Sequence, residues 1–176
     1  MLVWQEARRQ ARALVGESEM AGDPYRLASK YGIRVRVGKL PSDVSGMIVK
    51  EAGHDAEILL SQEDSEARRR FTCAHELGHY IERTVVAGDR DFSFRDLRSP
   101  GGNYDLHEFF ADEFAGELLM PARTFGRELQ AGTPISALAL KYGVSISAAE
   151  KRQERLRRFP EPDLDLVHAS PAGSCN

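Results

Sequence analysis

Cysteine and long apolar runs are what this sequence most clearly lacks. Its 176 residues contain two cysteines, Cys73 and Cys175, so no disulfide framework can be inferred and a reducing compartment is expected. No run approaches the roughly 18 apolar residues that a membrane-spanning helix needs. The opening stretch, MLVWQEARRQARALVG, lacks the continuous apolar core of a signal peptide. We therefore expect a soluble, cytoplasmic protein.

A strong excess of either charge is also missing. The formal net charge of -3 gives no reason to expect overall attraction to nucleic acid or to anionic membranes. The hydrophobic fraction of 41% is enough to form a buried core. The length suits one compact domain, or one domain with a small appendage.

Hydrophobic periodicity predicts a mostly helical α+β protein with a small three-stranded sheet. Helical spacing of apolar residues, together with capping residues, predicts helices over 4–15, 24–31, 65–83, 106–120, 123–130, 134–143 and 145–158. Short β-type segments lie at 33–37, 46–50 and 57–60, and the last two flank a polar turn as in a hairpin. Residues 85–104 are polar and rich in glycine, so they are expected to form a long loop.

The helix predicted over 65–83 contains His75-Glu76-Leu77-Gly78-His79. Histidines four residues apart share a helix face, with Cβ atoms about 5–6 Å apart, so both imidazoles can bind one metal ion. Glu76 points to the side of the pair, where it can reach a metal-bound water without itself binding the metal. This division of roles makes the H-E-x-x-H spacing suitable for hydrolysis.

A catalytic zinc site needs a third protein ligand, and the next strongly predicted helix offers several. Glu108 and Asp112 share one face of it. We expect Glu108 to bind the metal and Asp112 to accept the free ring N–H of a ligating histidine. Glu113 is the alternative ligand, although it and Glu117 are rotated about 100° away and are expected to face solvent. His107 is a possible competitor for the metal.

These two helices together resemble the ImmA/IrrE family of metallo-endopeptidases. The segments that carry the resemblance are FTCAHELGH at 71–79, EFFADEFA at 108–115 and LLMP at 118–121, within a likeness that covers about residues 1–158. The resemblance implies one Zn²⁺ per chain bound by His75, His79 and Glu108, in the ligand order of thermolysin-like enzymes, with Glu76 as the general base. Family members often have Asn where this chain has Asp112.

Three parts of the chain are predicted, and the resemblance implies a type of substrate. A zincin-like metallopeptidase domain is expected over residues 1–130, a helix-turn-helix-like extension over 131–159 and an acidic, proline-containing tail over 160–176. The implied substrate is a regulatory protein, typically a helix-turn-helix repressor, cleaved in stress response or mobile-element control. A tetrahedral intermediate also needs an oxyanion donor; Tyr104 and His107 lie in a plausible region, and the sequence does not identify the donor.

The extension ends in a basic helix, which allows a second interpretation. Two short helices around Gly143 fit a helix-turn-helix, and a basic second helix could contact phosphates. The alternative, which we favour, is a solvated helix in which Glu150 and Glu154 pair with its bases at i,i+4 spacing. Those bases are Lys151, Arg152, Arg155, Arg157 and Arg158. The triplet Arg68 to Arg70 is likewise expected to be an exposed face.

Two functions therefore compete. The first is a zinc-dependent endopeptidase that acts on a regulatory protein, whose extended chain could pair with an edge of the 46–60 hairpin. The alternative is a regulatory module that keeps zinc without proteolysis and binds protein or DNA. The presence of Glu76 favours the enzyme, because that residue serves the water and not the fold.

Overall fold

The computed structural model describes residues 2–16, 22–51, 53–89, 94–98 and 105–161. Its sheet contains β1 (Arg34–Gly38), β2 (Gly46–Lys50), β3 (Glu57–Ser61) and β4 (Phe94–Arg98) in the order β1-β3-β2-β4. β1 runs parallel to β3, whereas β2 is antiparallel to both β3 and β4. The α+β class, the three predicted strands and the hairpin are confirmed.

The fourth strand corrects the prediction of a long loop over 85–104. β4 pairs with β2 in a register that runs from Gly46 opposite Arg98 to Lys50 opposite Phe94. Its polar sequence concealed it, because strand pairing uses main-chain groups and needs no apolar alternation.

The idea of peptide binding at the edge of the hairpin is also wrong. β2 lies between β3 and β4, and β3 lies between β1 and β2, so both hairpin strands are paired on both sides. Among the strands that the structure describes, the free edges belong to β1 and β4.

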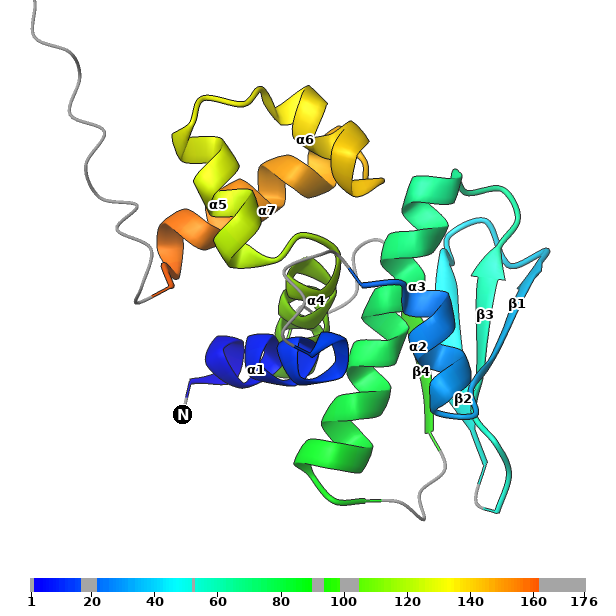
Figure 1. Ribbon diagram of the computed structural model, residues 1–176. Coiled ribbons are helices and arrows are strands. Elements are labelled where there is room, and N and C mark those ends of the chain that lie inside the picture. Colours follow the sequence, from blue (N-terminus) through cyan, green and yellow to red (C-terminus); the bar gives the residue numbers. More distant parts are fainter. Residues whose placement is uncertain (1, 17–21, 52, 90–93, 99–104, 162–176) are drawn as a thin grey trace, which may run out of the picture.

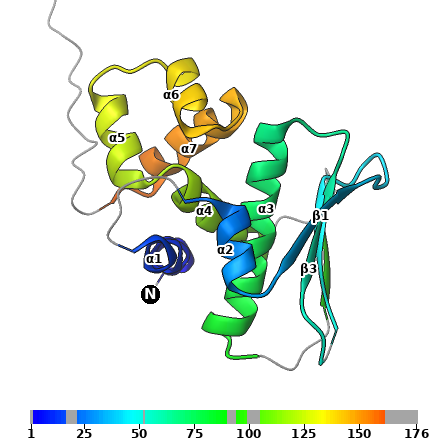
Figure 2. The same cartoon turned by 45° about the vertical axis from the view of Figure 1, so that its right-hand side comes forward.

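Helix α3 (Glu66–Ile81) covers one face of the sheet, as Figure 1 and Figure 2 show. The Ser65 side chain caps its N-terminus, and its C-terminus continues into a π-helical turn, η1 (Glu82–Val86). Because neighbours cover it on several sides, Ala74, Leu77 and Ile81 are fully buried. The short helix α2 (Pro24–Lys30) also packs against α3.

On the side away from the sheet, α3 packs along α4 (Leu106–Leu119), and α4 packs in turn on α1 (Val3–Val15). α5 (Ala122–Gln130), α6 (Ile135–Tyr142) and α7 (Ile146–Arg158) follow as a group. One buried apolar cluster runs from α3 and α4 into this group and includes Leu77, Phe114, Leu138 and Leu156. Within the described residues, no helix is long and apolar enough to cross a membrane.

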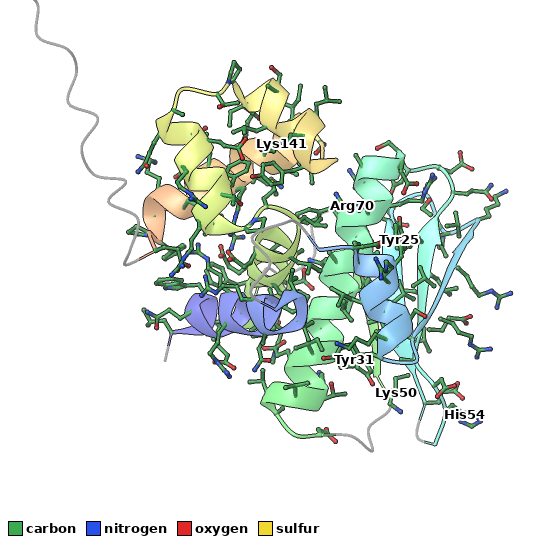
Figure 3. All side chains as sticks on the ribbon, viewed as in Figure 1. Tyr25, Tyr31, Lys50, His54, Arg70 and Lys141 are labelled. Atoms are coloured by element: carbon green, nitrogen blue, oxygen red, sulfur yellow. The ribbon has the colours of Figure 1, made fainter. Side chains whose placement is uncertain are left out.

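The turn between α6 and α7 is attached directly to α3. Gly143 ends α6 with a φ of 63°, a left-handed conformation that favours glycine. The Arg70 guanidinium of α3, labelled in Figure 3, donates to the carbonyl oxygens of Tyr142, Gly143 and Gly22. Arg70 is therefore partly buried, which corrects the expectation that it belongs to an exposed face.

Candidate metal centre

The site forms at a close contact between α3 and α4. A Cβ atom added to Gly78 would lie 3.0 Å from the Cα of Ala111 and 3.2 Å from the Phe114 ring, closer than ordinary carbon contacts. Gly78 lies between the two histidines, and Ala111 lies between Glu108 and Asp112. Glycine at position 78 therefore lets the polar faces of the two helices meet.

Three of the predicted residues, His75, His79 and Glu108, converge in this gap. The Nε2 atoms of His75 and His79 are 3.1 Å apart. The Glu108 carboxylate lies 3.4 Å from the first of these nitrogens through Oε2 and 3.3 Å from the second through Oε1. Within the described residues, this is the group of His, Cys, Asp and Glu side chains that could hold a metal ion.

The spacing of these three side chains is compatible with zinc. Bonds of about 2.0–2.1 Å at tetrahedral angles place neighbouring ligand atoms about 3.3–3.4 Å apart. The two Nε2 atoms, 3.1 Å apart, are close to that spacing, and each of them has one Glu108 oxygen at 3.4 or 3.3 Å. Two imidazoles and one carboxylate are also a ligand set that suits zinc and leaves one coordination position open.

Burial and charge at the site favour a cation. His75 and His79 are almost completely buried, whereas 26% of the Glu108 side chain is exposed, so the site opens to solvent near that carboxylate. Hydrogen bonds with His75 and then His79 hold the pKa of Glu108 well below its usual range, although burial opposes them. Glu108 is therefore a carboxylate at neutral pH and can act as an anionic ligand.

Asp112 lies where the sequence predicted, on the far side of the His75 ring. Its Oδ1 is 3.0 Å from His75 Nδ1. An N–H at Nδ1 that donates to this carboxylate leaves the Nε2 lone pair directed toward the other two ligands.

Glu76 and Cys73 lie near the histidines on α3 and are fully buried. Burial first, and then the nearby charges of Glu76 and Asp23, raise the pKa of the Cys73 thiol to about 12. Cys73 is therefore a protonated packing residue, as a buried thiol usually is.

His107, which the sequence raised as a competitor for the metal, does not join the metal centre. His107 is directed at Glu82, with its Nδ1 3.1 Å from Glu82 Oε1, and 61% of its side chain is exposed. It is not part of the metal-binding group. Tyr104 lies outside the described residues.

The prediction that Glu113 and Glu117 face solvent is wrong. Their exposed fractions are 1% and 3%. Glu113 Oε2 accepts from Arg8 Nε of α1 at 2.9 Å, and Glu117 accepts a short hydrogen bond from Arg152 of α7. Glu113 is therefore committed to ion pairs behind the site and does not serve as the alternative metal ligand.

This buried ion network continues into the start of the tail. Arg8 Nη1 donates to Glu161 Oε1 at 3.1 Å and to the carbonyl oxygen of Phe159 at 2.8 Å. Arg12 also pairs with Glu161, at 3.2 Å. The tail beyond Glu161, with Cys175, lies outside the described residues.

The basic helix α7 is not the uniformly solvated helix that was expected. Arg157 and Arg158 do pair with Glu154 on the exposed side. Arg152, however, is 3% exposed, and Arg155 Nη2 lies 3.3 Å from Asp112 Oδ2. Sequence reasoning missed the inward role of both arginines. Arg152 lies between the buried residues Ala149 and Leu156 at helical spacing, a signal that could have identified it.

The fold and the site together define an α+β protein with a His–His–carboxylate group on two packed helices. This chain belongs to the Peptidase M78 family, described as the IrrE N-terminal-like domain, whose profile matches residues 28–154. Membership of this zinc-dependent family indicates a metallopeptidase.

The likeness extends to individual proteins, among them a phage protein and a solved bacterial structure. The chain is 29% identical over 138 residues to an uncharacterized immunity region protein 2 of Bacillus phage phi105, covering 78% of this chain and 84% of that protein. A solved structure of a Mycobacterium tuberculosis transcriptional regulator shares the fold, with a TM-score of 0.59 and 18% identity. The match covers 92% of this chain and 48% of that protein, so the chain spans about half of its length.

Proposed function

We propose that this protein is a cytoplasmic, zinc-dependent endopeptidase that cleaves a regulatory protein, such as a helix-turn-helix repressor. One zinc ion per chain would be bound by His75, His79 and Glu108. The observation that carries the proposal is the convergence of two Nε2 atoms and one carboxylate at separations of 3.1–3.4 Å. The buried Glu76 follows the first of these histidines, where hydrolysis needs a base.

When bound, zinc supplies a Lewis acid that polarises a carbonyl group and acidifies a water molecule. The Glu76 carboxylate takes a proton from the attacking water and delivers it to the nitrogen of the leaving amine. Asp112 holds the His75 ring in the tautomer that turns Nε2 toward the ligand group.

The substrate class is supported by resemblance. ImmA/IrrE proteins typically cleave repressors, and the name of the phage relative places that relative in an immunity region. The alternative, DNA binding through α7, is less well supported, because Arg152 and Arg155 bind carboxylates of α4. Their charges are therefore not on an outer face where they could meet phosphates.

The decisive experiment compares wild type with Glu76→Gln. Both proteins are loaded with zinc, and their metal content is measured by mass spectrometry. Each is then incubated with the protein encoded by the neighbouring gene as the candidate substrate. We expect one zinc per chain in both, and cleavage slower by about 10²–10⁴-fold in the variant, the usual contribution of a general base. Cleavage by Glu76→Gln at the wild-type rate would refute the mechanism. Zinc binding without any cleavage by wild type would favour the non-proteolytic alternative.

A further inference from the structure

Arg155 connects the C-terminal helix to the candidate metal centre. Its Nη2 lies 3.3 Å from Asp112 Oδ2, and its Nη1 lies 3.1 Å from Glu113 Oε1. The guanidinium carbon also lies 4.6 Å from the centroid of the Phe109 ring. One side chain of α7 thus binds two consecutive carboxylates of α4 and stacks on an aromatic ring of the same helix.

Asp112 is consequently held from both ends. Oδ2 faces Arg155, while Oδ1 lies 3.0 Å from His75 Nδ1. A carboxylate fixed in this way can present Oδ1 to the imidazole in only a narrow range of orientations. The His75 ring is then positioned with its Nε2 toward His79 and Glu108.

We infer that Arg155 is a positioning residue of the metal centre, which acts on the metal through Asp112 and His75. The inference rests on the proposed function, in that it takes His75, His79 and Glu108 as the zinc ligands. If Arg155 has this role, helix α7 helps to complete the metal site, although α7 lies beyond residues 1–130, which were expected to form the metallopeptidase domain. Partners that orient metal-ligating histidines typically change metal affinity by about 10–100-fold.

Docking of α7 does not depend on Arg155 alone. Arg152 donates to the carbonyl oxygen of Met120 at 3.0 Å and pairs with Glu117, and Leu156 is 1% exposed. Arg70 attaches the turn before α7 to α3. Truncation of Arg155 should therefore leave α7 in place and release mainly Asp112.

The first experiment measures the zinc affinity of the full chain by competition with a chromophoric chelator at fixed pH. We expect Arg155→Ala to bind zinc about 10-fold more weakly than wild type. Arg158→Ala is the matched control, because it removes the same kind of side chain from the same helix. Arg158 is 68% exposed and pairs with Glu154, away from Asp112. The control should bind zinc as wild type does. The d–d absorption bands of the cobalt-loaded protein should shift in Arg155→Ala alone.

A double-mutant cycle separates positioning from a general loss of packing. If Arg155 acts through Asp112, then Arg155→Ala should weaken zinc binding little further in an Asp112→Ala background. The melting temperatures of the metal-free proteins show whether each variant folds. If Arg155→Ala does not fold, Arg155→Lys keeps a charge but loses the planar fork, and a smaller loss of the same kind is expected.

The two proposals fail in different ways. Wild-type zinc affinity in a folded Arg155→Ala protein, or an equal loss in the presence and absence of Asp112, would overturn the positioning role alone. Failure of the wild-type chain to bind zinc would overturn the proposed function and the positioning role together.

Discussion

Arg8 offers the strongest test of the buried ion network. Arg8 is a residue of α1, and its side chain is completely buried. It pairs with Glu113 at 2.9 Å and with Glu161 at 3.1 Å. Replacement by methionine keeps much of the side-chain volume but removes the charge. Removing one partner of a buried ion pair usually costs about 3–5 kcal/mol, because the other charge stays buried. In Arg8→Met, Glu113 still pairs with Arg155. We therefore expect the free energy of unfolding to fall by about 3 kcal/mol, the lower end of that range.

The corresponding thermal shift is large enough to measure. A chain of this size loses roughly 2–4 °C in Tm for each kcal/mol, so Arg8→Met should melt about 6–12 °C below wild type. Circular dichroism melting of the metal-free protein measures this shift, and urea unfolding provides an independent value. The matched control is Arg9→Met, because Arg9 neighbours Arg8 but is 56% exposed and forms an i,i+3 pair with Glu6 on the surface. We expect no measurable change in Tm for the control, and equal melting temperatures for the two variants would refute the structural role of the Arg8 charge.

Three further predictions concern the helix contact, the alkaline pH range and the metal. In Gly78→Ala, the added methyl group must push α3 away from Ala111. We therefore expect weaker zinc binding, and a free energy of unfolding lower by about 1–3 kcal/mol in chemical denaturation. Unchanged zinc affinity and unfolding free energy would contradict the close approach of the two helices. Burial raises the pKa of the Tyr142 hydroxyl to about 12 in the folded chain, whereas an unfolded chain has a tyrosine pKa of about 10. The unfolded chain therefore loses this proton at lower pH, and the free energy of unfolding should fall as pH rises from about 10 to 12. Tyr142→Phe should reduce that fall in urea unfolding at several pH values, and an identical profile would refute the assignment. Glu108→Ala should abolish stoichiometric zinc, measured by mass spectrometry, and a retained ion would exclude Glu108 as a ligand.

The sequence was most informative where structure is local. Helical spacing alone placed His75 beside His79 and Glu108 beside Asp112, because 3.6 residues per turn determine which side chains share a face. The sequence also predicted that Gly143 ends one helix and that a serine such as Ser145 begins the next. In the structure Gly143 ends α6 and Ser145 caps α7. The predicted division at residue 130 stays a prediction, although the buried apolar cluster runs across it.

The interpretation of Glu113 and Glu117 failed for a physical reason. Carboxylates are rarely buried unless they are paired, so a solvent-facing position is the reasonable expectation for them on a helix. Their partners, Arg8 and Arg152, lie 105 and 35 residues away along the chain. No local pattern shows that such partners will meet.

What the sequence determined by itself is the chemistry of the two helices: a histidine pair with an adjacent base, and a carboxylate pair at matching spacing. Only the tertiary structure decided how closely those helices pack at Gly78 and which carboxylates turn inward. Only the tertiary structure decided, too, that β4 pairs with the outer side of β2. It also brought Arg155 to Asp112 across 43 residues. Helix periodicity is set by neighbouring residues, whereas burial of a charge depends on a partner that the fold brings from a distance.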